Sequence, residues 1–64
     1  MTNKEKIEEQ LTNDPIIKDF SLDTEINANL YIYQINFNPG YERYNGLYDC
    51  CLIENDAISY INHN

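Results

Sequence analysis

Residues 30–37, Leu-Tyr-Ile-Tyr-Gln-Ile-Asn-Phe, decide how this chain is expected to fold. The segment is rich in aromatic and β-branched residues, and the turn-forming sequence Asn-Pro-Gly follows it at residues 38–40. An apolar run of this composition that ends in a turn is typical of a β-strand.

Two more strands are predicted downstream of this one. Asn45-Gly46 favours a tight hairpin, because both residues tolerate a positive φ. A strand is then expected over residues 47–53, a turn at residues 54–56 and a last strand over residues 57–61. Residues 41–44 form either a short strand or part of a loop.

The chain upstream of the first strand begins with a helix signal. Thr2 and Glu5 have the spacing of a capping box, in which each residue binds the backbone N–H of the other. Ile7 and Leu11 follow one turn apart on a single helical face, and Pro15 predicts that the helix ends before it.

Asp14-Pro15 also resembles a second helix start, with an N-cap residue followed by proline. Ile16, Ile17 and Phe20 would be the apolar residues of a short helical turn. Residues 21–27 are polar and are interpreted as an irregular linker into the sheet.

These elements predict one α+β domain over residues 1–64, with a helical part over 2–20 and a sheet part over 28–62. An N-terminal helix and a short helical turn would pack on a three- to four-stranded antiparallel β-meander. A chain of this length buries only about 60% of the surface that it exposes when unfolded. A partner subunit is therefore an expected source of stability.

The predicted sheet has apolar residues on both faces. Tyr31, Tyr33, Ile35 and Phe37 share one face of the first strand, because side chains alternate along a strand. One helix covers one face, so an apolar, tyrosine-rich patch is expected to stay exposed and to bind a partner or a second copy of the chain. The alternative is that the tyrosines are ordinary strand formers. The predicted partner-binding residues are Tyr31, Tyr33, Phe37, Tyr41, Glu42, Arg43, Tyr44, Tyr48 and Tyr60.

The chain carries a formal net charge of −7 and has only four cationic residues. Direct binding to nucleic acid needs positive charge to displace counterions, so it is not expected. Binding to an anionic membrane surface is not expected for the same reason. A basic protein surface would be attracted, although acidity alone also maintains solubility.

Several acidic residues in the N-terminal half are interpreted as a contact surface. If they align, they imitate the charge row of a nucleic acid duplex, with about one charge per 1.7 Å of axis. A basic nucleic-acid-binding protein is then the favoured partner. The predicted acidic contact residues are Glu5, Glu8, Glu9, Asp19, Asp23 and Glu25.

Catalytic and metal-binding groups are sparse. Cys50 and Cys51 are adjacent, and a disulfide between neighbours would distort the backbone, so both are predicted to be free thiols of a cytoplasmic protein. His63 is the single histidine, and no fourth ligand completes a zinc site with these residues. We therefore expect no enzyme activity, no metal and no cofactor. No secretory signal or membrane-spanning stretch is predicted either.

In size, acidity and lack of catalytic groups, the chain is similar to the small inhibitors that phages and mobile elements make against host nucleases and CRISPR effectors. The leading hypothesis is a protein-binding inhibitor of this kind, present as a homodimer, that acts by steric or nucleic-acid-mimicking occlusion. The alternative is an accessory subunit or assembly domain that docks its sheet onto a larger protein.

Overall fold

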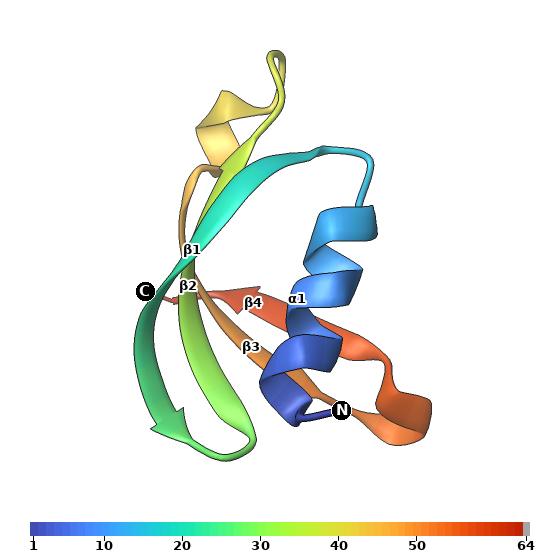
Figure 1. The fold of residues 1–64 in the computed structure, drawn as a ribbon. Coiled ribbons are helices and arrows are strands. Elements are labelled where there is room, and N and C mark those ends of the chain that lie inside the picture. The colour runs from blue at the N-terminus through green and yellow to red at the C-terminus, as the bar shows by residue number, and fades with distance from the viewer. Residues whose placement is uncertain (64) are drawn as a thin grey trace.

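One α-helix packs against one face of a four-stranded antiparallel sheet (Figure 1). The computed structural model describes residues 1–63. The strands follow the order β1-β2-β3-β4, so that β1 and β4 are the edges of a meander. This arrangement confirms the predicted α+β fold. The elements are α1 (Asn3–Asn13), β1 (Ile17–Asn27), β2 (Leu30–Phe37), the 3-10 turn η1 (Glu42–Tyr44), β3 (Gly46–Leu52), the 3-10 turn η2 (Glu54–Asp56) and β4 (Ile58–Asn62).

The helix begins as the sequence predicts. The Thr2 hydroxyl accepts a hydrogen bond from the Glu5 backbone N–H at 3.1 Å, and the Glu5 carboxylate accepts one from the Thr2 N–H at 2.9 Å. These bonds hold the pKa of Glu5 below its usual value. Ile7 and Leu11 are the buried residues of α1, and the helix ends at Asn13, before Pro15.

The segment after the helix is a strand, and the predicted helical turn and linker are wrong. Asp14 starts a turn instead, because its carboxylate accepts a bond from the Ile16 N–H at 3.0 Å and its carbonyl accepts one from the Ile17 N–H at 3.3 Å. Ile17 then pairs with Phe37, and β1 runs along β2 to Asn27. The helical part therefore ends at residue 13, and the sheet begins at residue 17 rather than at residue 28.

The connection between β2 and β3 spans residues 38–45 and is not the predicted two-residue hairpin. Asn45 has a φ of −55°, and its side chain accepts a hydrogen bond from the Phe37 N–H at 2.7 Å. The second predicted turn is confirmed, since Asn55 and Asp56 adopt φ values of 62° and 58° in η2.

The core lies between α1 and the tyrosine-bearing face of the sheet. This face is the more apolar of the two, because Gln34 and Asn36 lie on the opposite face of β2. Two tyrosine hydroxyls at its rim donate to carboxylates, Tyr33 to Glu8 at 2.8 Å and Tyr60 to Asp14 at 2.9 Å. The buried cluster consists of Ile7, Leu11, Tyr31, Tyr33, Ile35, Phe37, Tyr48 and Cys50.

Alkaline pH is expected to destabilise the fold through these hydroxyls. Burial and the Asp14 carboxylate raise the pKa of Tyr60 from 10.0 to about 12, and burial beside Glu8 raises the pKa of Tyr33 further. Above about pH 10, the unfolded chain loses protons that the folded chain keeps, so the free energy of unfolding falls as pH rises. Urea unfolding at several pH values should show a shallower fall for Tyr60→Phe. Identical slopes for the two proteins would contradict this assignment.

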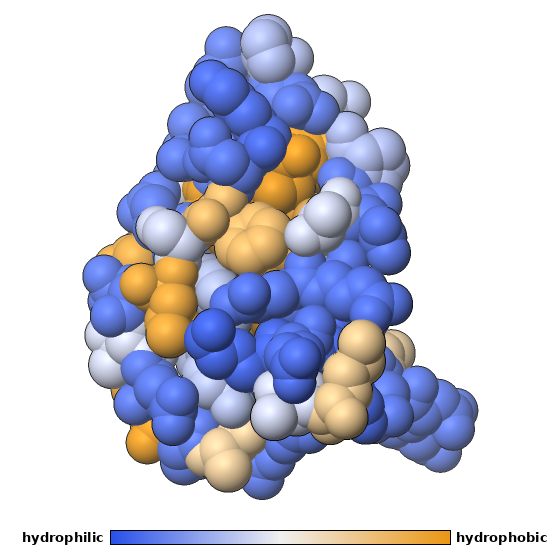
Figure 2. All heavy atoms as spheres, in the orientation of Figure 1, coloured by the Kyte–Doolittle hydropathy of each residue, from blue (hydrophilic) through white to orange (hydrophobic). Residues whose placement is uncertain are grey.

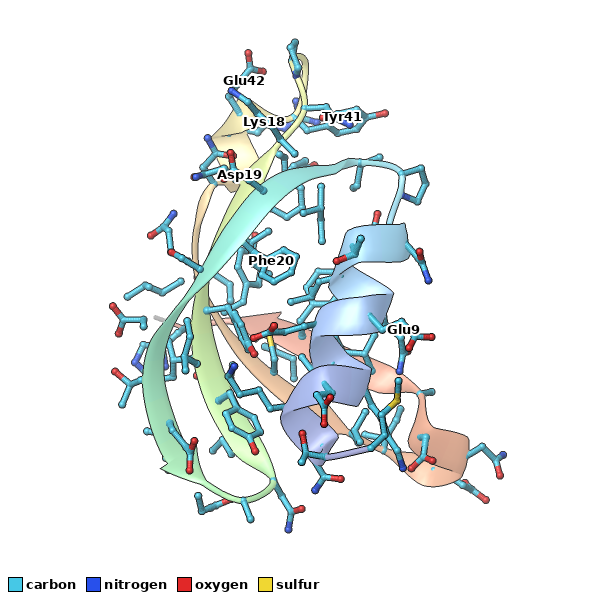
Figure 3. All side chains as sticks on the ribbon, in the orientation of Figure 1. Glu9, Lys18, Asp19, Phe20, Tyr41 and Glu42 are labelled. Atoms are coloured by element: carbon cyan, nitrogen blue, oxygen red, sulfur yellow. The ribbon has the colours of Figure 1, made fainter. Side chains whose placement is uncertain are left out.

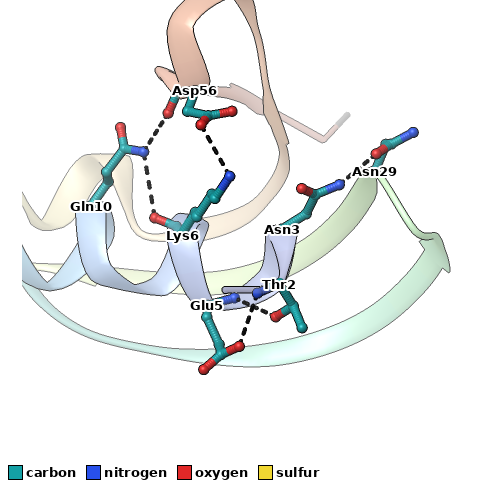
Figure 4. Close-up of polar contacts among 7 residues, drawn as sticks. All are labelled: Thr2, Asn3, Glu5, Lys6, Gln10, Asn29 and Asp56. Carbon is teal, nitrogen blue, oxygen red and sulfur yellow. Dashed lines mark hydrogen bonds and ion pairs between the residues drawn. The ribbon is translucent and has the colours of Figure 1, made fainter.

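Side-chain bonds join α1 to the η2 turn (Figure 4) and to β4. The Gln10 side-chain N–H donates to the Asp56 carbonyl at 2.7 Å, and its carbonyl accepts a bond from the Ile58 N–H at 2.9 Å. Lys6 and Asp56 form an ion pair at 3.0 Å beside them. We call the two hydrogen bonds of the Gln10 side chain the Gln10 bridge.

Gln10→Glu is expected to lower the free energy of unfolding by about 1–3 kcal/mol. The introduced carboxylate has no proton to donate at neutral pH, so the Asp56 carbonyl loses its partner and faces a negative charge. Urea unfolding measures the loss. Glu9→Gln on the exposed side of the same helix is the control and should stay within about 0.5 kcal/mol of the wild type. Equal effects of the two changes would show that the Gln10 bridge has no energetic role.

Candidate protein-interaction surface

Three of the six predicted partner-binding tyrosines lie in the core, together with Phe37. Tyr31, Tyr33, Phe37 and Tyr48 are buried under α1, so their assignment to an exposed contact surface is wrong. The helix packs on this face because it offers the larger apolar area, and burial of apolar area drives packing. Tyr60 is half-buried at its rim.

The other four predicted residues stay exposed in the loop between β2 and β3, at one end of the sheet (Figure 3). Tyr41 and Tyr44 are 40% and 44% exposed. The Arg43 guanidinium carbon lies 4.5 Å from the centre of the Tyr44 ring, and Arg43 donates to the Tyr44 hydroxyl at 3.0 Å. Tyr44 also packs edge-on against Phe37, at 6.2 Å between ring centres. We call Tyr41, Glu42, Arg43 and Tyr44 the aromatic loop.

Glu42 and Arg43 keep this loop close to neutral. Backbone hydrogen bonds, from the N–H of Glu42 itself and from that of Gly40, hold the pKa of the Glu42 carboxyl below its usual value. Gly40 has a φ of 99°, which side-chain-bearing residues rarely adopt. The aromatic loop thus exposes the rings of Tyr41 and Tyr44 and the charged side chains of Glu42 and Arg43.

The six predicted acidic contact residues do not form one row. Glu5 is engaged in the helix cap, and Glu8 binds both Lys4, at 3.0 Å, and the Tyr33 hydroxyl. Glu9 points away from the sheet, whereas Asp19 lies on β1 across the molecule (Figure 3). The acidic residues of α1 therefore do not lie in line with the acidic residues of β1.

The remaining three acidic residues, Asp19, Asp23 and Glu25, are exposed along β1. Asp19 accepts a bond from the Asn36 side chain at 2.8 Å, and Asp23 accepts one from the Thr24 hydroxyl at 2.8 Å. Both contacts are with neutral groups, so they leave the carboxylate charges uncompensated.

β1 is an edge of the sheet, since β2 is its one neighbouring strand. Within residues 1–63, no loop or side chain hydrogen-bonds to the backbone of residues 18–26 from the outer side. Edge strands of this length present a row of free N–H and C=O groups. We call residues 18–26, with these groups, the β1 edge.

Apolar side chains lie beside the β1 edge on the helix side. Phe20 packs edge-on against Tyr33, at 5.8 Å between ring centres, and Leu22 is 39% exposed. Figure 2 shows hydrophobic residues between β1 and α1, with hydrophilic residues beside them. Interpreting residues 21–27 as a linker missed this surface, although the alternation of Phe20, Ser21 and Leu22 is the pattern of a strand.

The second face of the sheet has no covering element within residues 1–63. Cys51 and Leu47 are half-buried on this face of β3, and Ile61 on β4 is 66% exposed. Polar residues interrupt the apolar ones, and a carboxylate oxygen of Asp49 lies 2.8 Å from Nδ1 of His63. We call this surface the open face.

The two cysteines are free and lie on opposite faces of β3. Burial raises the pKa of the Cys50 thiol to about 12. A thiol reagent at roughly pH 8 should therefore modify Cys51 in the folded protein and both thiols in denaturant, because the thiolate is the reactive species. Mass spectrometry measures the number of labels. Cys51→Ser should abolish native labelling, and labelling at the wild-type rate would contradict this prediction.

Within residues 1–63, the structure has no pocket, and no three potential metal ligands lie together. No helix in this range has the length and apolarity needed to cross a membrane. The candidate surfaces of the described chain are therefore the β1 edge, the aromatic loop and the open face. A scan of protein-family models and searches of curated proteins and solved structures found no match to this chain.

Proposed function

We propose that this protein acts by binding another protein, as a small acidic inhibitor of a basic nucleic-acid-binding protein. The observation that supports this proposal is the exposed, uncompensated charge of Asp19, Asp23 and Glu25 along the β1 edge. A basic surface would be attracted to these carboxylates over a distance of about one Debye length, which speeds the encounter.

The cations of the chain do little to offset this charge. Lys4 and Lys6 form ion pairs with Glu8 and Asp56, and Arg43 lies over the Tyr44 ring. Lys18 is the one cation on β1. The net charge of −7 is therefore available to a partner at the surface.

The proposed target class is a host nuclease or a CRISPR-type defence effector, encountered in the host cytoplasm by a phage or mobile-element product. Proteins of this class hold nucleic acid in positively charged grooves. A domain of this size in such a groove would block entry sterically, and the carboxylates of the β1 edge would occupy positions that phosphates otherwise take.

The test is capture of the tagged protein with its partner from the native host, followed by reconstitution from purified components. Fluorescence anisotropy then measures nucleic-acid binding by the partner as this protein is added. We expect the partner to be basic and its nucleic-acid binding to be lost at about equimolar addition. A saturated complex that binds nucleic acid normally would overturn inhibition by occlusion.

The open face favours a second candidate function, an accessory subunit that docks its sheet onto a larger protein or onto a second copy of the chain. Exposed apolar area at Ile61, which pairs with Asp49 on this face, is the observation behind it. Ile61→Lys separates the two candidates, because it should abolish assembly of a subunit and leave inhibition through the β1 edge unchanged. Light scattering on the purified protein measures whether a homodimer forms.

A further inference from the structure

We infer that the β1 edge takes up an extended segment of the partner as a fifth strand of the sheet, and that this segment alternates basic and apolar residues. The inference rests on the proposed protein-binding function and adds the surface, the geometry and the chemistry of the partner. Three independent features of β1 support it.

The first feature is the free backbone of a long strand. β1 has 11 residues, and within residues 1–63 its outer edge meets no other element. A peptide that adds to such an edge gains main-chain hydrogen bonds, and alternate side chains of the peptide then provide specificity. β4, the opposite edge, has five residues and offers a much shorter row.

The second feature is the apolar surface beside that edge. Phe20 and Leu22 lie on the helix side of β1, as their pairing with Ile35 and Tyr33 shows. Both side chains keep exposed area, and Phe20 lies between β1 and α1 (Figure 3). Apolar residues of an added strand would cover this surface, since every second side chain of the strand points to the same face.

The third feature is the charge along the same strand, which selects a basic strand over a second copy of β1. Asp19, Asp23 and Glu25 lie within seven residues. An antiparallel copy of β1 centred on this stretch would bring carboxylates against carboxylates, and like charges opposite each other destabilise a sheet. Asp19 lies on the face of β1 opposite to Phe20 and Leu22, where the basic residues of an alternating strand would meet it directly. Glu25 pairs with Tyr31 on the helix side, so it would attract these basic residues only through the longer-range field of the edge.

The test uses the whole protein and a short synthetic peptide of alternating lysine and valine at low salt. Amide NMR should show the largest peptide-induced shifts at residues 18–26. The same peptide with an N-methyl group on every residue cannot donate backbone hydrogen bonds from either of its edges and should give no shifts there. Absence of shifts with the first peptide, shifts mainly on the open face, or equal shifts with both peptides would overturn the inference.

Matched double variants separate the local charge from the total charge. Asp23→Asn with Glu25→Gln should weaken peptide binding about three- to tenfold, as expected for the loss of two exposed charge pairs. Glu9→Gln with Glu54→Gln removes the same charge away from β1 and should change binding less than about twofold. Leu22→Lys should also weaken binding, because it places a charged side chain against the apolar residues of the added strand, and its exposed position should let the variant fold. Equal weakening by the two double variants would overturn the inference.

The native partner distinguishes failure of this inference from failure of the proposed function. Asp23→Asn with Glu25→Gln is expected to release the purified partner and restore its nucleic-acid binding. If the partner stays bound and inhibited, the β1 edge is not the binding surface, and the inference is overturned although the proposed inhibition is not. A partner whose nucleic-acid binding never falls would instead remove the proposed function.

Discussion

Leu11→Ala is expected to lower the free energy of unfolding by about 2–5 kcal/mol, the usual range for a large-to-small change in a core. Leu11 is 1% exposed, and Ile7 and Leu11 are the buried residues of α1. A domain of this length has a total stability of roughly 3–10 kcal/mol. A large fraction of the molecules should therefore unfold at moderate temperature.

Thermal and urea unfolding measure this loss, with Thr12→Ala as the control on the same helix. Thr12 is exposed, so its replacement should change the stability by no more than about 0.5 kcal/mol. The melting temperature of Leu11→Ala should fall by at least about 10 °C. If the two variants melted together, the helix would contribute little to the core.

Tyr33→Ala is expected to cost about 3–5 kcal/mol, comparable to other aromatic truncations. Tyr33 is fully buried, and its ring contacts both Phe20 and Tyr31. Its hydroxyl reaches Glu8 at the rim of the core. Truncation therefore removes the centre of the cluster and the bond between the sheet and α1.

Tyr33→Phe separates these two contributions, because it keeps the ring and removes the hydroxyl. The expected cost is about 1 kcal/mol, the usual value of one hydrogen bond, since Glu8 keeps both Lys4 and contact with water. Chemical denaturation of the two variants gives the difference. A phenylalanine variant as unstable as the alanine variant would show that the hydroxyl, rather than the packed ring, holds this part of the core.

The capping box and the strand over residues 30–37 could be predicted because their signals are local. Thr2 and Glu5 act within one helical turn, and β2 is a central strand whose residues are mostly buried. β1 could not be recognised in the same way. It is an exposed edge strand, and register shifts at Lys18, Asp23 and Ile26 interrupt its alternation. Its pairing with β2 overrides the helix-start signal of Asp14-Pro15.

The sequence alone was sufficient to predict which face of the sheet the helix covers. Gln34 and Asn36 occupy the face opposite to Ile35 and Phe37, so the tyrosine face was the better candidate for the core. Residues 41–44 were predicted as either a short strand or part of a loop, and the structure places them in a loop with the 3-10 turn η1. The β1 edge was missed as a surface because its free backbone becomes visible only when the strand order is known.

The Gln10 bridge has a consequence for the way the chain acquires its structure. It joins residues that are 46 and 48 positions apart. At a synthesis rate of roughly 5–20 residues per second, the helical segment is made seconds before Asp56 and Ile58. Helices this short are marginal on their own in water. The helix is therefore expected to become stable only after β4 has been synthesised. The domain should then fold in a single late step.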